Sequence, residues 1–222
     1  MKKAANFFVV VLLLSFCLMP TGFASLSQTY YNEGMKYSRQ GNYRAALAAF
    51  THCIDSLENN APGYGCFARR AAAQSNLGAY DAAIQDATEA IKRYSGNYSY
   101  GHYVRGHAYR EKKEYDAALM DLQKALAFAD KSDKSFLVQI YHDLGRTHYG
   151  MGVCDQAISN FQLSLDIDPQ FASGYWYLGN AHKKAGNTEE AIKAYENFIQ
   201  YAKDADSRVN SAKEFIKKLR SP

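Results

Sequence analysis

Small and apolar residues recur along residues 27–203 in five copies of one pattern. Each copy has a small residue, an alanine twelve positions later, and apolar or small residues sixteen and twenty positions later. The small residues are Gly34, Ala71, Gly106, Gly145 and Gly179, at intervals of 37, 35, 39 and 34 residues. The alanines are Ala46, Ala83, Ala118, Ala157 and Ala191. Because spacings of four keep side chains on one face of a helix, each copy is expected to form two helices that cross at the small residue.

A turn is expected seven positions after each small residue. Glycine stands there in four copies, at Gly41, Gly78, Gly152 and Gly186, and the third copy has Lys113 instead. Glycine adopts the left-handed backbone that ends a helix without a steric penalty. The pattern therefore predicts a helix, a tight turn and a second helix in every copy, with a strained turn at Lys113.

Four segments carry a resemblance to a known family. GNYRAALAAF, GAYDAAIQDA, KEYDAALMDL and GNTEEAIKAY resemble the turn and second helix of the tetratricopeptide repeat, and YWYLG at 175–179 resembles its first helix. The resemblance implies an all-α fold, a right-handed α-solenoid of five helix-turn-helix units. These units are expected at about 27–60, 64–97, 99–132, 138–171 and 172–204. The extra residues at 59–65 and 131–135 are expected to lengthen connections.

A final helix is expected within residues 205–222 as a cap. Its apolar residues, Val209, Ala212, Phe215, Ile216 and Leu219, repeat at helical spacing among lysines and arginines. A solenoid exposes the apolar face of its last repeat, and a helix with one polar side covers that face.

Residues 1–24 are expected to be an export signal. Lys2 and Lys3 precede an apolar run of 13 residues from Phe7 to Met19, and small residues at positions 22 and 24 predict cleavage after Ala24. The run is too short for a typical membrane span, although an uncleaved anchor is the alternative. We therefore expect a periplasmic or secreted protein without a stable membrane anchor.

Composition and charge narrow the classes of partner and chemistry. The chain is 47% hydrophobic and 22% charged, which is typical of a chain with a buried core. Its net charge of +4 falls to +2 without residues 1–24, too little to indicate nucleic acid binding. Phosphate-binding and hydrolase motifs are absent from the sequence, so we expect neither enzymatic activity nor a cofactor or metal.

Three cysteines remain after removal of the signal. Cys53 and Cys66 are 13 residues apart on expected neighbouring helices, and an oxidising compartment would permit a disulfide between them. Two buried free thiols are the alternative. Cys154 replaces a turn aromatic and is expected to pack as a small side chain.

The resemblance implies that the first helices of the units line a concave groove. Positions −6, −3, +1 and +4 relative to each small residue share one helix face, and they become aromatic and basic toward the third to fifth units. The expected groove residues, with Arg69 at the edge, are Tyr31, Arg69, Tyr100, Tyr103, His107, Arg110, His142, Arg146, Tyr149, Trp176, Asn180 and Lys183.

These residue types favour a protein or peptide partner, because Tyr, Trp and Arg carry much of the binding energy at interfaces. The basic groups suit a segment with acidic groups or a free C-terminus. One subclass of the family binds heat-shock chaperones through lysine and asparagine side chains. This sequence has Tyr31, Met35 and Arg69 at the corresponding positions, which argues against such a chaperone as the partner. Two alternatives are a self-assembling homo-oligomer and a small anionic ligand bound by His107, His142 and Arg146.

Overall fold

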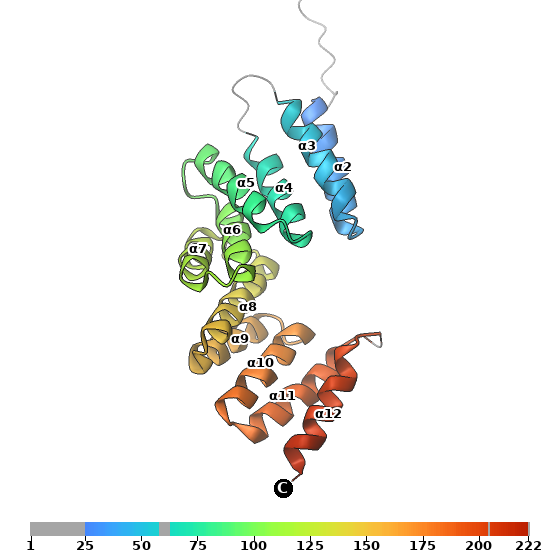
Figure 1. Ribbon diagram of the computed structural model, residues 1–222, viewed down its shortest axis with the longest axis vertical. Coiled ribbons are helices and arrows are strands. Elements are labelled where there is room, and N and C mark those ends of the chain that lie inside the picture. The colour runs from blue at the N-terminus through green and yellow to red at the C-terminus, as the bar shows by residue number, and fades with distance from the viewer. Residues whose placement is uncertain (1–24, 58–62, 204, 222) are drawn as a thin grey trace, which may run out of the picture.

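The computed structural model describes residues 25–57, 63–203 and 205–221, and its eleven helices in these residues form five antiparallel pairs and one final helix (Figure 1). The pairs are α2 (Leu26–Arg39) with α3 (Tyr43–Asp55), α4 (Tyr64–Asn76) with α5 (Tyr80–Arg93), α6 (Ser99–Glu111) with α7 (Tyr115–Phe128), α8 (Lys134–Met151) with α9 (Cys154–Ile167), and α10 (Ala172–Ala185) with α11 (Thr188–Tyr201). The final helix is α12 (Arg208–Arg220). The all-helical solenoid expected from the repeat is confirmed.

The turns inside the pairs follow the expected backbone. Gly41, Gly78, Gly152 and Gly186 have φ angles of 73°, 81°, 83° and 84°, and Lys113 has a φ of 64°. A left-handed conformation brings the Cβ of a non-glycine residue close to the following carbonyl oxygen. The strained turn predicted at Lys113 is therefore confirmed.

In four of the five described pairs the helices cross where a glycine of the first helix meets a large side chain of the second, and in the second pair Ala71 packs against alanines of α5. A Cβ atom added to Gly145 would lie 2.6 Å from the Phe161 ring, and one added to Gly179 would lie 2.8 Å from the Tyr195 ring. Both rings are fully buried. The small residues are therefore required for the close approach of α8 to α9 and of α10 to α11.

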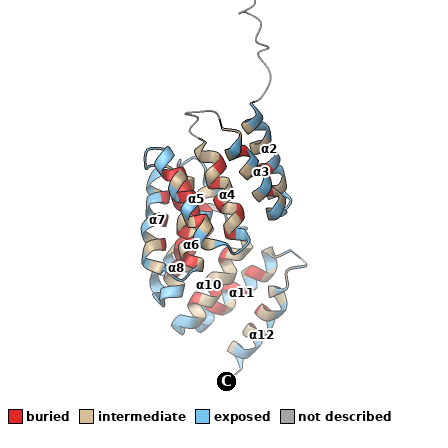
Figure 2. Cartoon of the chain, turned by 45° about the horizontal axis from the view of Figure 1, so that its top comes forward, coloured by how far each residue is buried: buried red, intermediate tan, exposed pale blue. Residues whose placement is uncertain are grey.

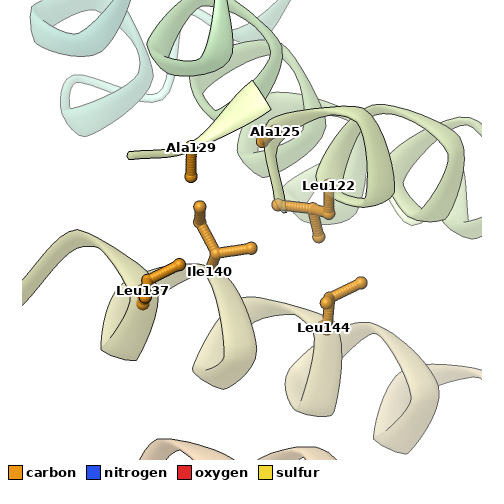
Figure 3. Packing of buried hydrophobic residues seen from close by; sticks show 6 residues of the cluster. All are labelled: Leu122, Ala125, Ala129, Leu137, Ile140 and Leu144. Carbon is orange, nitrogen blue, oxygen red and sulfur yellow. The ribbon is translucent and has the colours of Figure 1, made fainter. Parts of the chain in front are cut away.

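The hydrophobic core runs between the helices rather than forming one central mass (Figure 2). Between the third and fourth pairs, α7 and its C-terminal flank face α8 through aliphatic side chains (Figure 3). This cluster consists of Leu122, Ala125, Ala129, Leu137, Ile140 and Leu144. Each pair is thus stabilised by its neighbours, as expected for a solenoid.

Two pairs contain the same ion pair between their helices. Arg70 of α4 binds Asp86 of α5 with N···O distances of 2.7 and 2.8 Å, and Arg105 of α6 binds Asp121 of α7 with the same two distances. The arginines directly precede Ala71 and Gly106, so both bonds have the same place in the repeat. Such two-pronged contacts fix the relative orientation of the two helices.

Helix α8 begins earlier than the expected fourth unit and has 18 residues. The side chain of Asp133 accepts a hydrogen bond from the backbone N–H of Phe136 and thereby caps the first turn. Leu137 is buried against α7. The expectation that residues 131–135 form a connection is therefore wrong for Lys134 and Ser135, which belong to α8. Likewise, Tyr64 and Gly65 belong to α4 rather than to the connection before it.

Helix α12 covers the end of the stack. All five apolar residues expected on the cap, including Ala212 and Ile216, pack in the cluster that contains Tyr195 and Phe198 of α11. In the described residues, no helix is long and apolar enough to cross a membrane. The expected signal at residues 1–24 lies outside the described residues.

The sulfur atoms of Cys53 and Cys66 form a disulfide that joins α3 to α4. Their Cα atoms are 6.0 Å apart, and both side chains are buried. A cross-link over 13 residues restricts the unfolded chain and contributes about 3 kcal/mol in the chain-entropy account. Cys154 remains a free thiol.

The turn at Lys113 can be tested by reciprocal substitutions. Lys113→Gly is expected to raise the free energy of unfolding by about 1 kcal/mol, because glycine adopts the left-handed conformation without strain. Gly186→Lys at the equivalent turn is the matched control. It should lower the free energy of unfolding by a similar amount through backbone strain alone, because no atom lies within 4 Å of an added Cβ there. Urea unfolding measures both. Equal stability of Lys113→Gly and the wild-type protein would contradict the strain.

Candidate functional site

A cavity of about 510 Å³ lies between the first helices of the second, third and fourth pairs, α4, α6 and α8. We call it the central hollow. Its aromatic wall consists of Tyr98, Tyr100, Tyr103 and Phe136. Its polar lining includes Arg69, Ser75, Asn76, His107, Asp133 and Gln139. Four of the expected groove residues, Arg69, Tyr100, Tyr103 and His107, therefore line one cavity. This cavity lies between the second and fourth pairs, whereas the sequence predicts the groove at the third to fifth units.

The aromatic wall is built from interlocking rings. The Phe136 centroid lies 6.0 Å from the Tyr100 centroid and 5.3 Å from the Tyr103 centroid, and the two tyrosine centroids are 6.2 Å apart. Burial raises the pKa values of Tyr98, Tyr100 and Tyr103. These phenols therefore stay protonated at neutral pH and can donate hydrogen bonds.

Arg69 places a positive charge against this wall. Its Nη1 donates to the Tyr100 hydroxyl at 2.9 Å, and its guanidinium carbon lies 4.1 Å from the Tyr100 centroid. Burial lowers the pKa of Arg69, but the Tyr100 and Tyr31 hydroxyls outweigh burial and raise it overall. Its buried Nε has no hydrogen-bond partner, and among the described residues no carboxylate lies within ion-pair distance of Arg69. The hollow therefore contains a cation without an anionic partner from the described part of the chain.

His107 of α6 also lines the central hollow. Its Nδ1 lies 3.0 Å from the Ser75 hydroxyl, a hydrogen bond that connects α6 to α4. Burial lowers the pKa of His107, while the nearby Asp143 partly offsets this effect. The imidazole is therefore neutral at pH 7, and Arg69 is the formal cation of the lining.

Arg110 and Arg146 belong to an ion-pair network between α6 and α8. Arg110 Nη1 lies 2.6 Å from Glu111 Oε1, and its Nη2 lies 3.3 Å from Asp143 Oδ1. Arg146 Nη2 lies 3.3 Å from the same Glu111 oxygen. Arg110 is only 6% exposed, so the expectation that it lines an open groove is wrong. The Arg110 guanidinium instead forms an ion pair with Asp143 that links α6 of the third pair to α8 of the fourth.

His142 is also buried, contrary to the expected groove position. Its ring centroid lies 5.1 Å from the centroids of Phe171 and Tyr177 and 5.7 Å from that of Phe161. Burial lowers its pKa to about 4. His107 faces the central hollow and Arg146 binds carboxylates. His142 Nδ1 and Arg146 Nη1 each lie 3.8 Å from Asp143 Oδ1, and the same carboxylate acts on the pKa of His107. The trio suggested for a small anionic ligand therefore surrounds a carboxylate of the chain itself.

The groove residues of the fifth pair contact the capping helix. The Trp176 ring lies 6.0 Å from the Phe215 ring of α12, and Lys183 Nζ lies 3.5 Å from the centroid of the same ring. Asn180 accepts a hydrogen bond from Tyr195 at 2.8 Å. These side chains take part in internal packing, which the repeat pattern did not indicate.

The remaining expected residues lie on either side of the central hollow. Tyr31 lines a smaller cavity between α2 and α4. Tyr149 packs beneath the Lys184 ammonium, 4.8 Å from its ring centroid. Sequence reasoning missed Tyr98 and Phe136 as site residues. Phe136 directly follows residues 131–135, for which the sequence predicts a connection. The aspartate three residues before Phe136 is the sequence feature that indicates a helix start.

No group of three or more His, Cys, Asp or Glu side chains that could hold a metal ion occurs in the described ranges of the chain. The lining of the central hollow offers instead one cation, several phenol hydroxyls, two amides and flat aromatic faces, and its one carboxylate, Asp133, caps α8. Such a surface can bind a carboxylate and neighbouring apolar groups by hydrogen bonding and burial.

The buried His142 predicts a loss of stability in acid. Its pKa is near 6.5 in an unfolded chain and about 4 in the fold, so its contribution is complete above pH 6.5 and is lost as the pH falls to 4. The loss is at most about 3 kcal/mol. His142→Phe, which suits the surrounding rings, should reduce the difference in unfolding free energy between pH 7 and pH 4. His52→Phe on the exposed side of α3 is the control. An unchanged pH dependence in His142→Phe would refute the assignment.

Models of one protein family match three segments of the chain. Models of the tetratricopeptide repeat match residues 27–59, 101–170 and 172–205, together more than half of the chain. Human tetratricopeptide repeat protein 13 is 28% identical over 163 residues, which are 71% of this chain and 18% of that protein. The photosystem I assembly protein Ycf3 of Synechococcus elongatus is 25% identical over 111 residues, 46% of this chain and 62% of that protein. The chain thus spans less than two thirds of these relatives.

Solved structures show the same fold at low sequence identity. MamA 41-end from Desulfovibrio magneticus RS-1 is 21% identical with a TM-score of 0.63, covering 83% of this chain and 99% of that chain. A thermophilic tetratricopeptide repeat protein from Thermus thermophilus is 22% identical with a TM-score of 0.68, covering 85% and 99%. The repeat pattern, the helical pairs and these matches agree, and the chain belongs to the tetratricopeptide repeat family, whose members generally act as scaffolds for protein–protein interactions.

Proposed function

We propose that this protein is a non-catalytic scaffold that binds an extended segment of a partner protein in the central hollow. A carboxylate of that segment, from an acidic side chain or a free C-terminus, contacts Arg69. The observation that carries the proposal is the half-buried Arg69, which has no carboxylate partner in the described part of the chain.

Arg69 differs in this respect from the arginines around it. Arg70, Arg105, Arg110 and Arg146 each lie within ion-pair distance of a carboxylate. Removing a charge from water is unfavourable unless a partner compensates it, and guanidinium groups bind carboxylates through paired hydrogen bonds. A carboxylate from a partner would provide the contact that the other arginines receive from within the chain.

The walls of the hollow support the binding of a peptide rather than of an isolated ion. Tyr98, Tyr100, Tyr103 and Phe136 offer aromatic surface beside the cation. Aromatic side chains bury a large area at a small cost in conformational entropy, and they are enriched among the residues that dominate interface energies. A cavity of about 510 Å³ has room for side chains next to the carboxylate.

We further propose that the scaffold acts outside the cytoplasm, in the cell envelope or after secretion. Two features support this proposal. Residues 1–24 have the composition of a cleaved export signal. The disulfide between Cys53 and Cys66 suits an oxidising compartment, where such bonds persist.

Co-purification from envelope extracts tests the proposed function. Arg69→Gln should reduce recovery of a wild-type partner at least tenfold, because it removes a charged hydrogen bond and leaves the partner's carboxylate unpaired. Arg44→Gln is the matched control, since Arg44 is an exposed arginine of α3 away from the hollow. Quantitative mass spectrometry measures both. Equal recovery by Arg69→Gln and Arg44→Gln variants with unchanged melting temperatures would contradict the proposal.

A further inference from the structure

A second cavity of about 350 Å³ lies between α2 and α4, next to the central hollow. We call it the disulfide hollow. Its lining combines the apolar or aromatic side chains of Tyr31, Leu57, Tyr64, Cys66 and Tyr98 with the polar but uncharged side chains of Ser27 and Gln28. None of these groups carries a formal charge, in contrast to the lining of the central hollow.

The two hollows are parts of one surface. Tyr98 lines both of them. Arg69 lines the central hollow, and the pKa of Arg69 is affected by Tyr100 from that hollow and by Tyr31 from the disulfide hollow. A carboxylate at Arg69 would therefore lie close to the entrance of the disulfide hollow.

The disulfide hollow is held in shape by the covalent bond beside it. Cys66 belongs to its lining, and the disulfide joins this residue to Cys53, which is fully buried in α3. Leu57, which follows α3, and Gly63, which precedes α4, lie on the same lining. A wall fixed before binding reduces the entropy lost when a ligand enters.

We propose that the disulfide hollow is a second subsite, which takes an apolar side chain of the same extended segment that places a carboxylate at Arg69. This inference rests on the proposed function and specifies the partner's chemistry. Charge complementarity at Arg69 favours an acidic residue there, and the apolar and aromatic surface of Tyr31, Leu57 and Tyr98 favours an apolar side chain in the disulfide hollow. Neighbouring helices are spaced by about 10 Å, and an extended chain covers this distance in about three residues.

A panel of synthetic peptides tests this pairing. Each peptide has ten residues of Gly and Ser with one Glu and an amidated C-terminus, so that the Glu is its only carboxylate. A Leu is placed two to five residues before or after the Glu. The same peptides with Ser for Leu, and with Gln for Glu, are the ligand controls. Fluorescence anisotropy gives the affinity of the oxidised wild-type protein. Leu at the best spacing should tighten binding about tenfold over Ser, because it removes an apolar side chain from water.

Two protein variants locate the leucine. Gly65 lines the disulfide hollow, and a Cβ added there would lie 3.4 Å from the Tyr31 ring, an ordinary contact. Gly65→Leu should therefore fill the hollow and abolish the preference for Leu while the preference for Glu remains. Ser27→Leu fills the same hollow from α2 and replaces Gly65→Leu if thermal melting shows that the latter does not fold. Ser38→Leu, near the other end of α2 and outside the lining, is the matched control.

The outcomes separate the inference from the proposed function. If Glu strengthens binding but Leu gives no gain at any spacing, the second subsite is refuted and the proposed function stands. A Leu gain that survives both Gly65→Leu and Ser27→Leu places the apolar side chain elsewhere and also refutes the subsite. If Glu gives no advantage over Gln in any peptide, the carboxylate contact at Arg69 fails, and with it both proposals.

Discussion

The close approach of the two helices at a small residue is the constraint on which the rest of the structure depends, and in four of the five described pairs a large side chain of the second helix packs against that residue. At Gly145 and Gly179 the rings of Phe161 and Tyr195 occupy the space that a Cβ atom would need. This contact brings the two helices of a pair together and buries one face of each. Stacking the pairs then aligns their first helices, and the side chains between α4, α6 and α8 are left to form the central hollow.

The fold could be predicted because its determinants repeat. Five copies of one spacing locate the helices, and the glycine turns separate them, so even the exceptional left-handed Lys113 was identifiable. The start of α8 could not be predicted from the repeat, because it depends on a helix cap that lies outside the repeat pattern. Asp133 caps a helix that begins one turn before the repeat, and the added turn brings Phe136 to the hollow.

The candidate site could be predicted only in part. The first-helix face was identified, and it contains Tyr100, Tyr103 and His107 at the central hollow. Helix periodicity gives the direction of a side chain but not what packs against it. His142 lies on the same predicted face and is buried among aromatic rings, and Trp176 contacts the capping helix. Such long-range contacts cannot be derived from spacing within one helix.

The most direct test of the crossing is a double-mutant cycle at Gly145 and Phe161, followed by urea unfolding. Gly145→Val should cost several kcal/mol because its side chain has no space beside the ring, and Phe161→Ala should cost about 3 to 5 kcal/mol through the cavity it leaves. The loss in the free energy of unfolding of the double variant should be at least about 1 kcal/mol smaller than the sum of the two single losses. The reason is that the alanine at position 161 leaves space for the valine at position 145. Additive losses, or a Gly145→Val protein as stable as the wild type, would contradict this account of the crossing.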